Sequence, residues 1–319
     1  MTEPESPRRV LLLTHTGRAE AREVATAALD ALVSNGLLVR VPAIELKDLG
    51  VDPDRPGVEC VDTEHGAGDG CELALVVGGD GSILRALELT YHARTPVLGV
   101  NLGHVGFLAE AEPEELDAMI EAIVHRRYAV EDRLALDVRV VHDGDTLFRT
   151  FAVNEASVEK GARERMLEVV VEIDGRPLSR WGCDGVVCAT PTGSTAYNFS
   201  AGGPVVWPEV EALCLVPLSA HALFARPMVV GPSSVIAIET IARTDGTGVL
   251  WCDGRRTVDL PAGTRVEVRR GEHPVRLARL HQAPFTDRLV AKFGLPVEGW
   301  RGIGERRRRR DDAVATVLP

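Results

Sequence analysis

The sequence predicts an N-terminal α/β domain with a parallel sheet, followed by a mainly antiparallel β domain. Up to about residue 130, short apolar runs alternate with helical stretches, which is typical of parallel strands joined by crossover helices. After Tyr128, apolar and polar residues alternate with a period of two, and turn pairs separate the segments. The 319 residues suffice for two domains of ordinary size.

The N-terminal elements are predicted from runs of apolar residues. These runs show little polar alternation, which indicates a sheet covered on both faces. We expect strands at residues 10–16, 37–42, 72–79 and 96–101, and helices at 19–34, 82–92 and 112–127. The last helix has its acidic residues early and its basic residues late, as the helix dipole favours.

The C-terminal half is predicted to be antiparallel because its strands alternate and its turns carry Asp-Gly pairs. We expect strands at 134–141, 166–173, 235–241 and 265–270. Turn pairs occur at Asp174-Gly175, Asp245-Gly246 and Asp253-Gly254. The last of these is interpreted as a hairpin turn without a further role. A short helix, ended by Gly294 and Pro296, is expected near the C-terminus.

Composition and charge exclude several classes of function. A net charge of −11 argues against broad nucleic-acid binding, which needs a basic face. No apolar run approaches the roughly 20 residues of a membrane span, and the start has no signal-peptide pattern, so we expect a cytoplasmic protein. The six cysteines form no C-x-x-C pair and are expected to be buried free thiols. The run Arg306–Arg310 indicates a disordered tail, or a docking site for an acidic partner.

Three stretches could carry chemistry. The first is GGDG at residues 78–81, placed at the carboxyl end of a predicted strand, where ligands bind in open α/β sheets. Its glycines allow close approach to a ligand, and the following helix offers free N–H groups to an anion. A tight structural turn is the alternative interpretation, and the position of Asp80 among phosphates needs an explanation.

The other two stretches are rich in groups that bind sugars and bases. Asn154 and Glu155 supply an amide and a carboxylate at adjacent positions, which can bind ribose hydroxyls, although both could equally cap a turn. The segment 182–208 has an unusual density of glycine and hydroxyl residues around Tyr197, an aromatic ring that could stack on another ring. We interpret this segment as a binding loop.

Taken together, these stretches resemble the NAD kinases, of the kind found in actinobacteria. The resemblance runs from about Arg9 to Gly302 and rests on the following motifs in this order: GGDGS, GVNLGHVGFLAE, NEASVEKG, CDGVVCATPTGSTAYNFSAGGP, HALFARPMVV, WCDGRR and PFTDRLVAKF. Two residues depart from the family pattern. Ser82 stands where threonine is usual, and Asn198 stands where a smaller residue is usual.

The resemblance implies transfer of the ATP γ-phosphoryl group to the 2′-hydroxyl of the adenosine ribose of NAD, giving NADP. A ribose hydroxyl is a poor nucleophile at neutral pH, so a carboxylate within hydrogen-bond reach can accept its proton. This assigns Asp80 the role of general base. In the family, the Asp-Gly pair of this turn contacts the NAD ribose, which carries over to Asp80 and Gly81.

Further NAD-binding residues follow from the same resemblance. Arg85 is similar to a family arginine near phosphate, with a surface salt bridge as the alternative. Asn154 and Glu155 match residues that bind the nicotinamide-side ribose and the pyrophosphate neighbourhood, Arg165 matches an arginine beyond that pair, and Asp184 matches an aspartate at the nicotinamide end. The adenosine pocket is implied to be lined by Thr195, Ala196, Tyr197, Asn198, Phe199 and Ser200, with Tyr197 against the base. His221 could approach the site, but we favour a core histidine.

The family also implies a domain division and partners. The expected segments are an α/β domain at 1–130, a β-rich NAD-binding and oligomerisation domain at 131–280, a segment at 281–302 that returns to the first domain, and a disordered tail at 303–319. The expected assembly is a homodimer or homotetramer. Because no His, Cys or carboxylate cluster has metal-site spacing, we expect Mg²⁺ or another divalent cation to arrive on the nucleotide phosphates.

Two other classes of protein are alternatives. Phosphofructokinases and lipid kinases share GGDG, but the first would carry a T-I-D-N-D-like stretch and the second would lack TGSTAYNFSAGGP. A non-catalytic NAD sensor would keep the pocket without turnover. The sequence leaves open whether inorganic polyphosphate replaces ATP and whether NADH is accepted.

Overall fold

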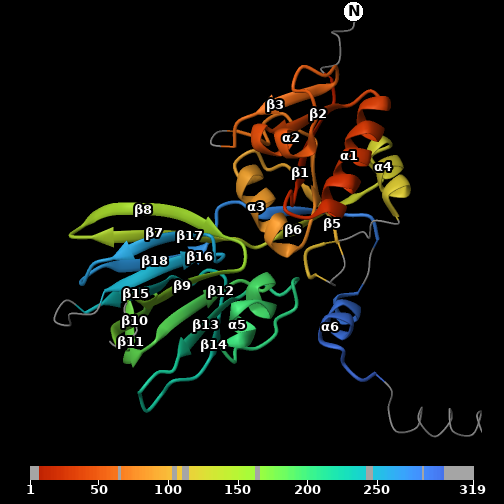
Figure 1. Ribbon diagram of the computed structural model, residues 1–319. Coiled ribbons are helices and arrows are strands. Elements are labelled where there is room, and N and C mark those ends of the chain that lie inside the picture. Colours follow the sequence, from red (N-terminus) through yellow and green to blue (C-terminus); the bar gives the residue numbers. More distant parts are fainter. Residues whose placement is uncertain are drawn as a thin grey trace, which may run out of the picture.

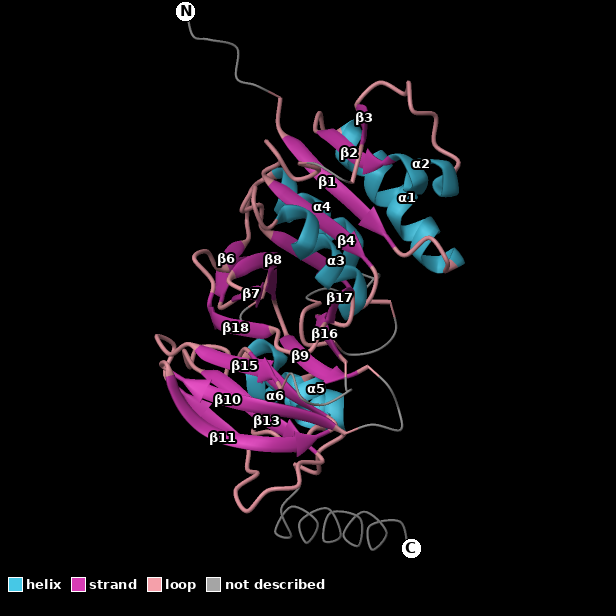
Figure 2. Ribbon diagram, turned by 90° about the vertical axis from the view of Figure 1, so that its left-hand side faces the viewer, coloured by secondary structure: helices cyan, strands magenta, loops and turns pink. Residues whose placement is uncertain are grey.

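The molecule consists of two lobes, an α/β lobe and a lobe made of two sheets (Figure 1). The computed structural model describes residues 7–63, 66–102, 106–109, 115–161, 166–241, 247–281 and 284–297. Helices are concentrated in the α/β lobe, whereas the second lobe is mostly strands (Figure 2). Within the described ranges, no helix is long and apolar enough to cross a membrane.

The α/β lobe is built on a seven-stranded sheet with the order β3-β2-β1-β4-β5-β19-β6. Neighbouring strands run parallel from β3 to β19, and β6 pairs antiparallel with β19 at the edge. This confirms the predicted parallel sheet. The strands are β1 (Arg9–Thr14), β2 (Leu38–Pro42), β3 (Val58–Val61), β4 (Leu73–Val77), β5 (Val97–Val100), β6 (Ala129–Arg133) and β19 (Val275–Arg279).

Helices cover both faces of this sheet, as the unbroken apolar strands predict. In β1, Val10 and Leu12 pack with helices α1, α2 and α4 on one face, while Leu11 and Leu13 pack with α3 on the other. The helices are α1 (Ala19–Ser34), α2 (Ala43–Leu49), α3 (Asp80–Thr90) and α4 (Leu116–Val124). Helix α1 matches its predicted range; α2 was not predicted, and α4 ends before the expected residue 127.

The second lobe contains two six-stranded sheets that enclose a common apolar core. The first has the order β11-β10-β15-β18-β7-β8, and it contains all four segments predicted from the alternation with a period of two. Its strands are β7 (Leu136–His142), β8 (Asp145–Ala152), β10 (Leu167–Ile173), β11 (Arg176–Cys183), β15 (Ile236–Thr240) and β18 (Arg265–Arg270). The fully buried Trp181 lies in the core between the sheets.

The other sheet has the order β14-β13-β12-β9-β16-β17 and carries a short helix, α5 (Tyr197–Ser200). Its strands are β9 (Glu155–Lys160), β12 (Gly185–Ala189), β13 (Leu213–Leu218), β14 (Met228–Val230), β16 (Gly248–Cys252) and β17 (Arg256–Leu260). The predicted hairpin turns at Asp174-Gly175 and Asp253-Gly254 are present, with positive φ at both residues of each pair. The pair Asp245-Gly246 lies outside the described residues.

The chain crosses between the lobes more than once. It re-enters the first sheet at Val275, the start of β19, whereas the sequence led us to expect that return from residue 281. Helix α6 (Phe285–Phe293) follows, and Gly294 ends it in the left-handed conformation, as predicted. The arginine run and the expected tail at 303–319 lie outside the described residues.

The cysteines are free within the part of the chain that the structure describes. Four of them are buried, and Cys71 is half-buried. Cys60 differs from the expectation because it is exposed on the edge strand β3.

Candidate active site

The GGDG turn lies at the carboxyl end of β4, where α3 begins. Asp80 is the first residue of α3, and Gly79 caps the helix. The Asp80 carboxylate accepts hydrogen bonds from the backbone N–H groups of Phe107 and Leu108, both at 3.1 Å. Gly106 packs so closely on Asp80 that a Cβ there would lie 2.3 Å from Oδ1. The loop after β5 therefore fixes the orientation of the carboxylate.

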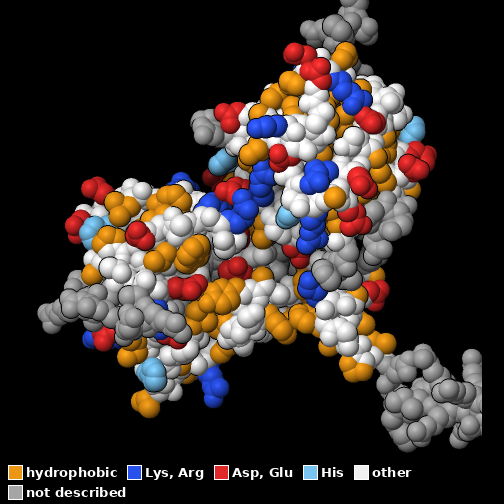
Figure 3. Space-filling view, in the orientation of Figure 1, with side chains coloured by type: hydrophobic (Ala, Val, Ile, Leu, Met, Phe, Trp, Pro, Cys, Tyr) orange, Lys and Arg blue, Asp and Glu red, His pale blue; other side chains and the backbone are white. Residues whose placement is uncertain are grey.

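A cavity of about 560 Å³ lies beside this turn. It is lined by the ends of β1 and β4, by the first turn of α3 and by the β16–β17 hairpin. Its basic residues are His15, Arg18, Arg85 and Arg255. Lys and Arg side chains also gather along the junction of the two lobes (Figure 3). Backbone N–H groups at a helix N-terminus and nearby guanidinium groups both favour a phosphate-bearing ligand.

Arg85 is held at the cavity wall by a buried carboxylate on α2. Its Nη1 lies 2.5 Å from Glu45 Oε1, and the other oxygen of Glu45 accepts the backbone N–H of Thr14 at 2.6 Å. Glu45 is buried, and this burial raises its pKa above the ordinary value although Thr14 and Arg85 oppose the shift. Arg85 therefore forms a salt bridge, but with a buried carboxylate rather than with the surface partner of the alternative interpretation, and this contact orients the arginine that lines the cavity.

Asn154 and Glu155 lie where the chain passes from one sheet of the second lobe to the other. Their position is fixed by Asp253, for which the sequence predicts only a hairpin turn. The Asp253 carboxylate accepts the backbone N–H groups of Val153, Asn154 and Glu155 at distances of 2.7 to 3.3 Å. Arg256 Nη2 lies 2.7 Å from the same carboxylate. Burial raises the pKa of Asp253 even though these donors favour its charged form.

Glu155 is an unusual carboxyl group because it is only 8% exposed. Burial, reinforced by the charge of Asp253, raises its pKa to about 8. Its Oε2 accepts the backbone N–H of Tyr197 at 3.4 Å, which links the strand junction to α5. Strongly shifted carboxyl groups concentrate at functional sites, so the shift and the contact with Tyr197 together make Glu155 a candidate site residue.

The glycine-rich loop after β12 packs against the Asn154 backbone. A Cβ on Gly193 would lie 1.9 Å from the Asn154 carbonyl oxygen, so only glycine fits there. Thr190 bonds to the Val153 carbonyl oxygen at 2.6 Å and accepts the Gly193 N–H at 3.0 Å. The structure thereby brings together two stretches that are about forty positions apart in the sequence.

The residues predicted to line the adenosine pocket differ in exposure. Thr195, Ala196 and Tyr197 are half-buried, whereas Phe199 and Ser200 are exposed. Asn198 is fully buried, and its amide nitrogen donates to the carbonyl oxygens of Ser194 and Pro204. The Asn198 side chain, which departs from the family pattern, therefore holds the loop of residues 194–204 together from inside the lobe.

The remaining predicted residues lie at the periphery or outside the described chain. Asp184 is half-exposed and forms an ion pair with Lys160 at 2.6 Å. His221 is exposed, so the expectation of a core histidine is wrong. Arg165 lies outside the described residues.

Charged side chains connect the two halves of the site across the lobes. Glu88 on α3 forms ion pairs with Arg255 at 3.2 Å and with Arg256 at 3.5 Å. Arg256 in turn pairs with Asp253, and its guanidinium lies 4.5 Å from the centre of the Phe151 ring. The helix that begins with Asp80 is thus tied to the hairpin that fixes residues 153–155. One feature of the sequence is consistent with this network: two arginines, Arg255 and Arg256, follow the Asp253-Gly254 turn directly.

No group of three or more His, Cys, Asp or Glu side chains that could hold a metal ion occurs in the described ranges. The described lining of the cavity combines three guanidinium groups and an imidazole with hydroxyl groups, backbone N–H groups and a single carboxyl residue, Asp253. Such a set suits an anion and does not suit a bare cation.

Comparison with known proteins gives consistent results. The family model described as the ATP-NAD kinase N-terminal domain matches residues 10–128, and the ATP-NAD kinase C-terminal domain matches residues 153–280. An NAD kinase of Thermobifida fusca is 59% identical over 300 residues, covering 92% of each chain.

Solved structures with a similar fold include a yeast NADH kinase complexed with NADH, with a TM-score of 0.82 and 24% identity over 92% of this chain and 90% of that chain. An NAD kinase from Archaeoglobus fulgidus in complex with ATP has a TM-score of 0.63 and 26% identity, and the match covers 90% of this chain and 97% of that chain.

Proposed function

This chain belongs to the ATP-NAD kinase family, and we propose that it phosphorylates the 2′-hydroxyl of the adenosine ribose of NAD with ATP, giving NADP. The observation that carries the proposal is the Asp80 carboxylate, which the 106–108 backbone holds in a turn whose glycines, Gly79 and Gly81, line the basic cavity. A phosphoryl-transfer site needs an acceptor for the hydroxyl proton beside a phosphate-binding surface. Both are present around the GGDG turn.

The donor phosphates would occupy the cavity between the lobes. Arg18, Arg85 and Arg255 supply positive charge there, and the first turn of α3 supplies backbone N–H groups. We propose that the divalent cation enters as part of the nucleotide substrate, where it would neutralise phosphate charge. This fits the basic donor set, since the described part of the chain offers no carboxylate cluster for a separate ion.

Asp80 would act as the general base. Each of its two oxygens accepts one backbone N–H, and a carboxylate has about four lone-pair positions, so either oxygen can accept a further hydrogen bond. The ribose hydroxyl can therefore donate to Asp80 without displacing the loop. As the O–P bond forms, the proton moves from the hydroxyl oxygen to the carboxylate, and the phosphoryl group leaves ADP.

NAD would bind between the two lobes, from the GGDG turn of the α/β lobe to α5 of the second lobe. In this proposal Asp80 and Gly81 contact one ribose, and Asn154 and Glu155 bind hydroxyl groups of the dinucleotide. The supporting observations are the fixed backbone at 153–155 and the buried carboxyl group of Glu155 beside Tyr197. We further propose that Arg85 lies near phosphate, that Arg165 binds beyond the Asn-Glu pair and that Asp184 meets the nicotinamide end. The adenosine pocket would be lined by Thr195, Ala196, Tyr197, Asn198, Phe199 and Ser200, with Tyr197 against the base.

We propose a homodimer or homotetramer formed through the second lobe. Apolar side chains on this lobe are open to solvent in the single chain, including Leu223, Phe224 at 50% exposure and Val229 at 52%. Val229 lies on β14, which is an edge strand of its sheet. The cytoplasmic location stays a prediction from the sequence.

The direct test is to incubate the purified chain with NAD, Mg²⁺ and ATP and to measure NADP. We expect turnover, and we expect Asp80→Asn to lower kcat by at least about a hundredfold, because general-base contributions are typically 10²–10⁴. NAD binding should survive the substitution. Asp143→Asn makes the same chemical change on an exposed hairpin and should leave kcat unchanged.

The assay also separates the alternatives. Rapid NADP formation by Asp80→Asn would refute the assigned role of the carboxylate. NAD binding without any NADP from the unmodified chain would favour the non-catalytic sensor. Replacing ATP with inorganic polyphosphate, and NAD with NADH, in parallel reactions defines the donor and the acceptor.

A further inference from the structure

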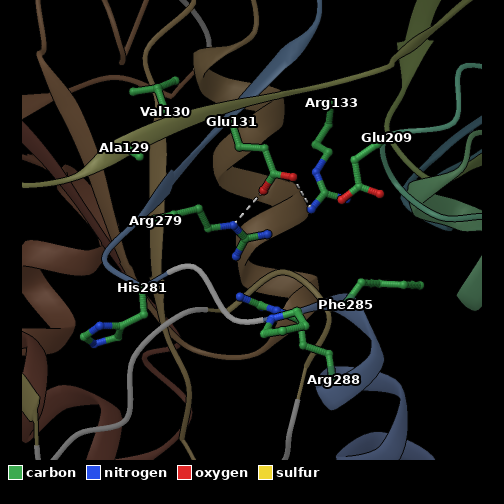
Figure 4. Close-up of a pocket in the computed structure, with 10 residues that line it drawn as sticks. Ala129, Val130, Glu131, Arg133, Glu209, Arg279, His281, Phe285 and Arg288 are labelled. Carbon is green, nitrogen blue, oxygen red and sulfur yellow. Dashed lines mark hydrogen bonds and ion pairs between the residues drawn. The ribbon is translucent and has the colours of Figure 1, made fainter.

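A second cavity, of about 430 Å³, lies on the other side of the loop that holds Asp80. It is enclosed by the edge strand β6, by β19, by α6 and by the segment that carries Glu209 (Figure 4). It shares no lining residue with the cavity at the GGDG turn. Nothing in the proposed reaction uses this second cavity.

Its walls carry three guanidinium groups. Arg133 Nη2 lies 2.7 Å from Glu131, and Arg279 Nε lies 2.9 Å from the same carboxylate. Figure 4 shows both arginines directed toward Glu131, with Glu209 beside Arg133 and with Arg288 across the cavity. Three arginines against two glutamates leave one formal positive charge on the lining.

The buried guanidinium group of Arg133 has an incomplete set of hydrogen-bond partners. The residue is only 8% exposed, and its Nε has no hydrogen-bond partner among the described residues. Burial lowers the pKa of this arginine in spite of Glu131, which means that the local charge does not fully offset the lost hydration. An additional anion on this guanidinium would relieve that imbalance.

The cavity is connected to Asp80 through a single loop. Arg279 Nη1 donates to the Leu108 carbonyl oxygen at 3.1 Å, and Arg288 Nη1 donates to that of Ala109 at 2.8 Å. The N–H groups of Phe107 and Leu108 bind Asp80. The loop is therefore held by the cavity arginines through its carbonyl groups and by the Asp80 carboxylate through its N–H groups.

We propose that this cavity binds a small molecule that carries a phosphate or carboxylate group on a flat apolar body. The anionic group would pair with Arg133, because a guanidinium matches planar or tetrahedral oxyanions with two hydrogen bonds. The apolar body would lie against Phe285 and Val130, which line the same space. A volume of this size accommodates a small organic ligand. An effect of this ligand on NADP formation, through the Asp80 loop, would rest on the proposed function.

The binding test uses phenyl phosphate as the probe and the full chain with its nucleotide site saturated by ATP. Calorimetric titration should detect binding that Arg133→Lys and Arg133→Gln weaken by about tenfold or more, as expected for loss of a charged hydrogen bond. Arg276→Gln, on β19 but outside the cavity, is the matched control and should leave the affinity unchanged. No binding, or binding that ATP prevents or that Arg133 does not influence, would overturn the proposal.

A second measurement needs no variant. Filling the space between the loop and α6 should restrict opening of the loop, so phenyl phosphate should slow hydrogen exchange at the Phe107 and Leu108 amides of the unmodified protein. Unchanged or faster exchange there would contradict the proposed site. Neither measurement depends on NADP formation, so failure of the site and failure of the proposed function are distinguishable.

Discussion

Replacing the buried Glu155 by glutamine should change how stability depends on pH. Burial raises the pKa of this carboxyl group from 4.5 to about 8 in the folded chain. Because its pKa is higher in the folded state than in the unfolded state, protonated Glu155 favours folding. This favourable contribution to the free energy of unfolding is fully present below about pH 4.5. It is lost as the pH rises toward 8. At 1.36 kcal/mol per pKa unit, the full displacement corresponds to roughly 5 kcal/mol.

The assay is urea unfolding of the unmodified chain and of Glu155→Gln at a series of pH values. Glutamine keeps the size of the side chain and cannot ionise, so the variant should gain stability relative to the unmodified chain by about 1.4 kcal/mol per pH unit between about pH 5 and pH 8. Glu168→Gln removes a surface carboxylate paired with Arg180 and serves as the control. If the curves for Glu155→Gln and the unmodified chain run parallel across this interval, the assigned shift is wrong.

Three further substitutions test other contacts of the site. Asp253→Asn should lower the free energy of unfolding by about 1–3 kcal/mol and weaken NAD binding, because a neutral amide is a poorer acceptor for three N–H groups and Arg256; urea titration and calorimetry check this. Gly193→Ala should destabilise the chain by about 1–3 kcal/mol in urea, since the Cβ collides with the Asn154 carbonyl. Glu45→Gln should raise the KM for ATP several-fold with little change in kcat, because Arg85 loses its charged partner. Initial rates measured over a range of ATP concentrations check this prediction.

The parts of the fold predicted from the sequence are those encoded locally. The run Leu73–Val77 followed by GGDG specifies a strand, a turn and a helix without reference to distant residues. The Asp-Gly pairs likewise specify hairpins, because both residues adopt positive φ. In contrast, β6 and β19 pair across more than one hundred and forty positions of the chain. The residue pattern of neither strand indicates to which sheet it belongs.

The same distinction applies to the site. The position of Asp80 follows from the turn, but its hydrogen-bond donors are backbone N–H groups, which carry no side-chain signature. The Asp-Gly pair predicts only a hairpin turn at Asp253. In the structure, the carboxylate of Asp253 also accepts three backbone N–H groups that lie about one hundred positions earlier in the chain. Asn198 stands in a motif that we predict to be rich in binding residues, yet its side chain is buried in the lobe.

The charged network between the lobes explains how such separate stretches can act as one site. Asp80 and Glu88 lie on the same helix, so an ion pair at Glu88 constrains the position of the GGDG turn. Arg256 transmits this constraint to Asp253, whose carboxylate sets the backbone at 153–155. Because Arg256 and Asp253 are largely removed from water, their interaction is screened less by salt than a surface pair would be. The separation between the proposed base and residues 153–155 is therefore governed in part by Glu88 and Arg256, neither of which lines the cavity at the GGDG turn.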